Sequence, residues 1–239
     1  MIKLFPLFTI LLIFTSCGNK YSVEGTSSIS RLDGKMLFIK TYKGDEWITI
    51  DSTEIIHGLF KMKGKLDTVM MTNIFLDKEN IMPMVLESGN IIVTISNTQF
   101  TANGTPLNDA LYTFIDKRND LELQLEDLEH KEAQMIMDGM NIDEIHQQLT
   151  SKGEAIINES NAYIKKFISD NYENVLGPSV FLMLCNSLPY PVMTPQIEDI
   201  LKDAPYSFKS NSMVREYIKK AKENMEVIEE RRRLRSESN

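Results

Sequence analysis

Cys17 is the residue of this chain whose position most clearly indicates chemistry. It closes an N-terminal segment that has a basic residue at Lys3, an apolar run over residues 4–14 and two small polar residues at 15–16. A run this short, with these flanks, predicts a secretory signal instead of a membrane-spanning helix. The mature chain is therefore expected in an oxidising compartment outside the cytoplasm.

The sequence Thr15-Ser16-Cys17 resembles a bacterial lipobox. The resemblance implies that residues 1–16 are a signal peptide, that cleavage occurs before Cys17, and that its thiol and new amino group carry lipid. Residues 17–20 would then be the lipidated N-terminus and tether, and several acyl chains anchor a protein stably. By resemblance to lipoprotein sorting signals, Gly18 after the cysteine implies the outer membrane, with the protein facing the periplasm.

The second cysteine, Cys185, has no intramolecular partner once Cys17 carries lipid. The chain therefore lacks a disulfide framework and a Cys-x-x-Cys couple. Cys185 ends the apolar run over residues 180–185, whereas reactive thiols need an electropositive and partly exposed site. We expect a buried, inert thiol.

The three histidines do not have the spacing of a zinc site, since they show neither the i, i+4 helical spacing nor cysteine companions. They are His57, His130 and His146. The last two could approach each other across a helical hairpin, but exposed side chains are the favoured interpretation. No metal and no cofactor is expected.

The carboxylates likewise form no recognisable catalytic set. Glu122, Glu126 and Glu129 share one helix face, which is typical of solvated, like-charged residues. The sequence has no Gly-x-Ser-x-Gly elbow and no phosphate-binding glycine loop. We therefore expect no catalytic residues and no enzymatic activity.

Methionine pairs are the one unusual enrichment. They occur at Met70-Met71, Met82-Pro83-Met84 and Met135-Ile136-Met137. Thioethers can select Cu(I), but methionine on strand and helix faces is more often adaptable core packing.

The formal net charge of −8 argues against nucleic acid or an anionic membrane surface as partner, because both require a basic footprint.

Residues 21–104 show the pattern of strands. Short β-branched or aromatic runs alternate with turn-forming residues. The expected strands cover residues 35–40, 47–50, 59–63, 69–71, 82–86 and 91–95. An antiparallel meander, a sandwich or a partly open barrel would follow.

Residues 105–239 change to the helical period, so the fold class is α+β. Thr105 offers an N-cap hydroxyl before Pro106, and the long helix that starts there should end near Asp138-Gly139. Asn141, with Glu144 three residues later, predicts the start of a second helix. Further helices are expected over residues 179–185, 195–201 and 213–234, the last with basic final turns.

The two long helices should pack as an antiparallel hairpin, because their outer faces are polar and an apolar seam must supply their stability. The expected seam joins Leu121, Leu125 and Leu128 to Ile145, Leu149 and Ile156.

Several short motifs occur in an order that is similar to a known family. They are Tyr21-x-Val23-x-Gly25, Asp51-Ser52-Thr53, His57-Gly58-Leu59-Phe60, Glu87-Ser88-Gly89-Asn90-Ile91 and Asn103-Gly104-Thr105-Pro106-Leu107-Asn108. Over about residues 21 to 120 the chain resembles the domain of unknown function "forty-three sixty-nine". That domain precedes thioredoxin-like domains in lipoprotein thiol-disulfide oxidoreductases, and the later helices resemble their linker region.

The resemblance implies a β-rich domain of the cell envelope, but no residue here matches the Cys-x-x-Cys motif of those oxidoreductases. We expect a lipid-anchored lipoprotein with a non-catalytic binding or scaffolding role and an unidentified protein or small-ligand partner. Two alternatives are an accessory or recognition module for a separate thioredoxin-like oxidoreductase, and a carboxylate-based hydrolase.

The lipobox interpretation is testable at Cys17. Replacing the thiol in Cys17→Ser removes the site of lipid attachment, so the precursor should remain uncleaved or the protein should appear in soluble fractions. Envelope fractionation with intact-mass measurement checks this. A variant that stays in the outer membrane at unchanged mass would contradict the lipobox.

Overall fold

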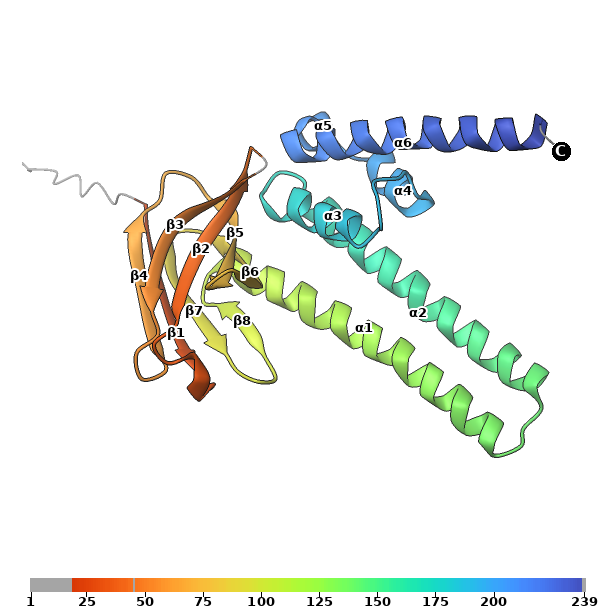
Figure 1. The fold of residues 1–239 in the computed structure, drawn as a ribbon, viewed down its shortest axis with the longest axis horizontal. Helices are drawn as coiled ribbons and strands as arrows, with labels where there is room; N and C mark the ends of the chain where they lie inside the picture. The colour runs from red at the N-terminus through yellow and green to blue at the C-terminus, as the bar shows by residue number, and fades with distance from the viewer. Residues whose placement is uncertain (1–18, 45, 238–239) are drawn as a thin grey trace, which may run out of the picture.

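The computed structural model describes residues 19–44 and 46–237. A β-sandwich is followed along the chain by a helical region (Figure 1). Strands give way to helices between Asn103 and Pro106, where the sequence predicts the change, and the α+β class is confirmed. None of the helices within residues 19–44 and 46–237 combines the length and the apolar character that a membrane span requires.

Eight strands of the described residues form two four-stranded sheets, neither of which closes into a barrel. Sheet A has the order β4-β1-β7-β8 and sheet B the order β3-β2-β5-β6. The strands are β1 (Lys20–Ser27), β2 (Met36–Lys43), β3 (Glu46–Glu54), β4 (Leu59–Lys65), β5 (Met70–Leu76), β6 (Glu79–Leu86), β7 (Gly89–Ile95) and β8 (Phe100–Asn103). A short 3-10 helix, η1 (Ser30–Leu32), follows β1. Alternate residues point into the space between the sheets, where Val23, Ile39, Ile74 and Val93 are fully buried.

Two features of the sandwich differ from the expectation. β1 and β7 pair in parallel, whereas every other strand pair is antiparallel among the residues described. β1 and β8 were not among the six expected strands. The four residues of β8, Phe-Thr-Ala-Asn, contain no run of β-branched residues. β8 forms by pairing with β7, so tertiary contacts decide its conformation.

The glycines of the early motifs have structural roles. Gly25 leaves room for the ring of Phe60 on the neighbouring β4, because a Cβ at Gly25 would lie 2.1 Å from that ring. His57 and Gly58, with φ angles of 52° and 72°, form the tight turn between β3 and β4. A Cβ at Gly58 would lie 2.6 Å from the carbonyl oxygen of Ser27, so this turn requires glycine.

Another pair of motif residues links the two sheets. The Tyr21 hydroxyl on β1 donates to the Asp51 carboxylate on β3 at 2.8 Å. Burial and this hydrogen bond together raise the pKa of Tyr21 to about 12, so the phenol remains a donor.

The sandwich is joined to the helices by the buried side chain of Asn108 in α1 (Pro106–Met137). Its Oδ1 accepts from the backbone N–H of Val85 at 2.9 Å, and its Nδ2 donates to the Val85 carbonyl at 2.7 Å. One side-chain amide thus pairs with both backbone groups of an edge-strand residue. Because buried backbone groups without partners are costly, this pairing fixes α1 against the edge of β6.

Glu87, at the end of β6, caps α1 instead of Thr105. Its Oε1 accepts from the backbone N–H groups of Leu107 and Asn108 at 2.9 and 3.1 Å. The Thr105 hydroxyl makes no capping bond and instead accepts from Asn108 Nδ2 at 2.9 Å, so the predicted hydroxyl cap is wrong. A carboxylate at a helix N-terminus also complements the helix dipole, which favours the long-range cap.

The long helices form the expected hairpin. α1 ends at Met137, and Asn141 Oδ1 accepts from the N–H groups of Asp143 and Glu144 to cap α2 (Ile142–Asp170). In the predicted seam Leu121 and Ile145 are buried, with exposed fractions of 1% and 0%. The other four seam residues, Leu125, Leu128, Leu149 and Ile156, are half-buried, because only two helices pack along the outer part of the hairpin (Figure 1).

Four further helices follow in the described part of the chain. They are α3 (Leu176–Asn186), α4 (Pro195–Lys202), α5 (Tyr206–Ser210) and α6 (Ser212–Glu237). The helix expected over residues 179–185 is longer in the structure, and α5 was not predicted. Phe181 of α3 contacts Phe208 and Tyr217 edge to face, so α3 is buried against α5 and α6.

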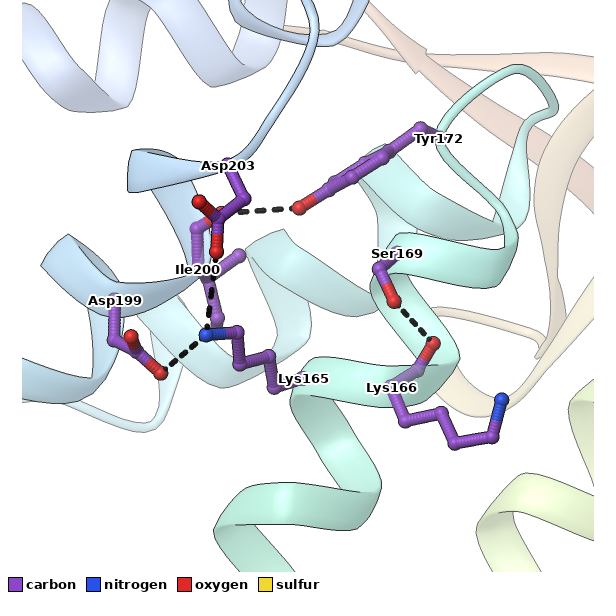
Figure 2. Close-up of polar contacts among 7 residues, drawn as sticks. All are labelled: Lys165, Lys166, Ser169, Tyr172, Asp199, Ile200 and Asp203. Carbon is purple, nitrogen blue, oxygen red and sulfur yellow. Dashed lines mark hydrogen bonds and ion pairs between the residues drawn. The ribbon is translucent and has the colours of Figure 1, made fainter.

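Polar contacts connect α4 to the end of α2 (Figure 2). Lys165 Nζ lies 2.7 Å from Asp199 and 3.6 Å from Asp203, and the Tyr172 hydroxyl donates to the Ile200 carbonyl at 3.0 Å. Because these ion pairs are exposed to solvent, which screens them, they contribute little to stability. The Tyr172 bond fixes the position of an aromatic ring that packs on Phe208.

The hairpin seam is testable with two leucines of the same helix. Leu121→Ala should cost about 2 to 5 kcal/mol, because Leu121 is buried, whereas Leu123→Ala, at a position 62% exposed, should cost within about 0.5 kcal/mol. Chemical denaturation of both variants checks the difference. Equal losses would mean that Leu121 does not hold the helices together.

Candidate functional site

Of the two cysteines, Cys17 lies outside the described residues, and its lipidation stays a prediction. Cys185 is 2% exposed, and burial raises the pKa of its thiol to about 12, although the Tyr217 hydroxyl opposes this shift. A neutral thiol without access to solvent is a poor nucleophile. The prediction that Cys185 is buried is confirmed.

The histidines lie at three separate places in the fold. His57 is in the β3–β4 turn and His130 is exposed on α1. His146 on α2 contacts the Glu132 carboxylate of α1 at 3.2 Å instead of meeting His130. Within residues 19–44 and 46–237, no group of three or more His, Cys, Asp and Glu side chains could hold a metal ion.

The other groups considered from the sequence divide between core and surface. Glu122, Glu126 and Glu129 are exposed on α1, as expected of a solvated face. Met82 and Met84 are buried in the sandwich core, with exposed fractions of 3% and 0%. The pair Met70-Met71 is half-buried and lines a cleft, which makes it the only methionine pair of the three predicted that lies there.

This cleft is the candidate site, and we call it the sandwich–helix cleft. It is open to solvent, has a volume of about 880 Å³, and separates the outer face of sheet B from α3, α5 and the first residues of α6. Ligand pockets in proteins commonly enclose about 300 to 1,000 Å³. Its two walls come from segments that are far apart in the chain, since the sheet wall ends at Asn80 and the helix wall begins at Tyr172.

Aromatic side chains form the wall on sheet B. Trp47 on β3 is 42% exposed, and its ring centroid lies 5.3 Å from that of Tyr42 and 4.9 Å from that of Phe75. Lys40 Nζ lies 4.5 Å from the centroid of Phe75 and makes a cation–π contact with that ring. Phe75 thus supports Trp47 from beneath, so the indole is held in place while part of its surface faces the cleft.

The opposite wall is built from helix residues. Leu182 and Met183 of α3 are half-buried in the cleft, and Met213 at the start of α6 is 38% exposed. Tyr172 lies against Phe208, with 4.8 Å between the ring centroids. Its hydroxyl is held by the Ile200 carbonyl, as Figure 2 shows, and burial followed by the charge of Asp203 raises its pKa.

The cleft has little charge but several polar groups without partners. Glu173 is the single charged residue among the described residues that line the cleft. Its carboxylate accepts a hydrogen bond from the Ser207 hydroxyl at 2.8 Å. The amides of Asn73, Asn80 and Asn186 make no side-chain hydrogen bond to any described residue. Each free amide can offer both a donor and an acceptor to a bound molecule.

Sequence reasoning did not identify this cleft. Trp47 is the single tryptophan of the chain and lies on a partly alternating strand, which is the one signal that could have pointed to an exposed aromatic residue. The residues opposite it lie on α3 and α5, and no sequence pattern joins them to β3. Chemically, the arrangement suits non-covalent binding through apolar contacts and amide hydrogen bonds.

Comparison with known proteins gives a family match, which covers the sandwich. None of the curated proteins compared matches the chain. The match to a family model begins at residue 21 in β1 and ends at residue 111 in α1, so it contains both Glu87 and Asn108 of the junction. The resemblance drawn from the short motifs is thereby confirmed: residues 21–111 match the family described as Domain of unknown function (DUF4369).

Proposed function

We propose that this protein is a lipid-anchored lipoprotein of the cell envelope that binds an uncharged, apolar segment of another polypeptide in the sandwich–helix cleft. The observation that carries the binding role is Trp47, a supported indole that is 42% exposed inside an open cleft. Large aromatic residues that are held rigidly and half-exposed are the usual anchors of binding sites.

The composition of the cleft favours a polypeptide. Met70, Met71 and Met183 bring flexible thioethers to both walls, and such side chains adapt to partners of varied shape. The free amides of Asn73, Asn80 and Asn186 can pair with backbone N–H and C=O groups of an extended segment. Apolar side chains of the segment would then contact Trp47 and Leu182.

The low charge of the cleft argues against other ligand classes. Nucleotides and phosphates require cationic side chains or glycine loops, and the lining contains no Lys or Arg among the residues described. A saccharide would place many hydroxyl groups against thioethers and aliphatic carbons, and each unpaired hydroxyl costs free energy. An apolar polypeptide segment meets neither difficulty.

The proposed anchor would place the cleft close to the membrane. β1 begins at Lys20, only three residues after Cys17, so lipid on Cys17 would hold the sandwich near the bilayer. The outer membrane and a periplasmic orientation are part of this proposal, which is supported by the lipobox and by the residue after Cys17.

Trp47 itself can report whether the cleft is occupied, because the chain has no other tryptophan. Uncharged peptides with alternating apolar and Asn or Ser residues should shift the Trp47 emission to shorter wavelength, since a bound segment removes water from the indole. Met183→Ala on the opposite wall should weaken binding about three- to tenfold. Ile48→Ala, a similarly exposed residue of β3 outside the cleft lining, should leave affinity unchanged.

Two results would contradict this proposal. An emission that no peptide shifts would mean that the cleft does not bind polypeptide. A shift with neutral oligosaccharides alone would move the ligand class from polypeptide to saccharide.

A further inference from the structure

The turn of the helical hairpin exposes four large apolar side chains. They belong to residues 136–142, which we call the hairpin tip, and have exposed fractions of 49% for Ile136, 86% for Met137, 39% for Met140 and 56% for Ile142. The tip lies at the end of the hairpin that is remote from the sandwich (Figure 1). No described element covers these side chains.

The conformation of the hairpin tip is fixed by backbone hydrogen bonds. The Gly139 N–H donates to the Ile136 carbonyl at 3.1 Å, and the Met140 N–H donates to the Met135 carbonyl at 3.1 Å. With Gly139 at a φ of 77°, these bonds form a Schellman motif, and Asn141 caps the next helix. A partner would meet a preformed apolar surface, which lowers the entropy loss on binding.

The same hairpin accounts for the net negative charge of the protein. Residues 119–160 contain eleven Asp and Glu and two Lys, a formal net charge of −9, whereas the whole chain has a net charge of −8. In the rest of the chain, acidic and basic residues nearly balance, so its net charge is close to zero. Glu122, Glu126 and Glu129 belong to this charge and are exposed along α1.

We propose that the hairpin tip is a docking surface for a basic protein partner, which receives Met137 and its apolar neighbours in a pocket surrounded by Lys and Arg. Charge complementarity selects this occupant, because the acidic helices behind the tip attract a cationic surface and accelerate its approach. The apolar side chains then supply affinity once water is excluded. This surface is separate from the sandwich–helix cleft.

Other occupants fit the observations less well. Nucleic acid and anionic lipid surfaces carry the same sign of charge as the hairpin, so they are repelled. Two tips of identical copies would bring two charges of −9 together in a symmetric contact. A basic protein surface is the occupant that satisfies both the charge and the apolar tip.

The defined probe for this proposal is a synthetic amphipathic helix of leucine and lysine, with a helix of leucine and glutamate as its counterpart. Calorimetry on protein that begins at Gly18 should show binding of the lysine helix and none of the glutamate helix. The double variant Met137→Gln with Ile142→Gln should weaken binding at least about tenfold, because two exposed apolar contacts are lost. Leu123→Gln, an exposed leucine of α1 outside the tip, should change affinity less than about twofold.

Charge and location have their own readouts. Replacing Glu122, Glu126 and Glu129 by Gln should reduce the salt dependence of binding, while the tip variant should leave that dependence unchanged. Emission from Trp47 should not respond to the lysine helix, because the tip is remote from the cleft (Figure 1). Because Trp47 emission reports only on the cleft, the two proposals can fail independently: calorimetry tests binding at the hairpin tip, and fluorescence tests binding in the cleft.

Four outcomes would overturn the proposal. They are the absence of lysine-helix binding, equal binding of the glutamate helix, affinity that the tip variant leaves intact, and Met137-dependent binding to phosphatidylglycerol vesicles. Self-association in sedimentation experiments that the tip variant abolishes would instead assign the tip to a second copy of this chain.

Discussion

The side-chain amide of Asn108 takes the position of a neighbouring strand beside β6, and the arrangement of the helices depends on it. Val85 at the sheet edge has both of its backbone groups paired with this one amide. A second contact at the same junction comes from Glu87, whose carboxylate caps the N-terminus of α1. Each of these buried groups would cost about 1 to 3 kcal/mol without a partner, so alternative directions for α1 are strongly disfavoured.

Both proposed binding surfaces follow from the direction that this junction gives to α1. α2 returns along α1, with Phe114 packed on Phe167 at 4.4 Å between ring centroids, and α3 follows opposite sheet B. The sandwich–helix cleft is the space that remains between the sheet and α3. The outer half of the hairpin extends past these contacts, and its tip is consequently left uncovered (Figure 1).

The sequence could predict the features that are determined locally. The end of α1 near Gly139 and the cap at Asn141 were predictable, because a left-handed glycine and an Asn side chain act on residues within one turn. The cap of α1 was not, since Glu87 lies 20 residues before Leu107 and displaces the local hydroxyl of Thr105. The parallel pairing of β1 with β7 and the position of Trp47 opposite α3 likewise depend on contacts that are distant in the sequence.

Hydrogen exchange of the Val85 amide tests the role of Asn108 most directly. In Asn108→Ala the Val85 N–H loses its acceptor, so its protection should fall far more than that of Ile74 in the sandwich core, and stability should fall by about 2 to 5 kcal/mol. Asn80→Ala, which removes an exposed amide without side-chain hydrogen bonds, should change neither quantity. Unchanged protection of Val85 in Asn108→Ala would contradict the claim that this amide joins the helices to the sandwich.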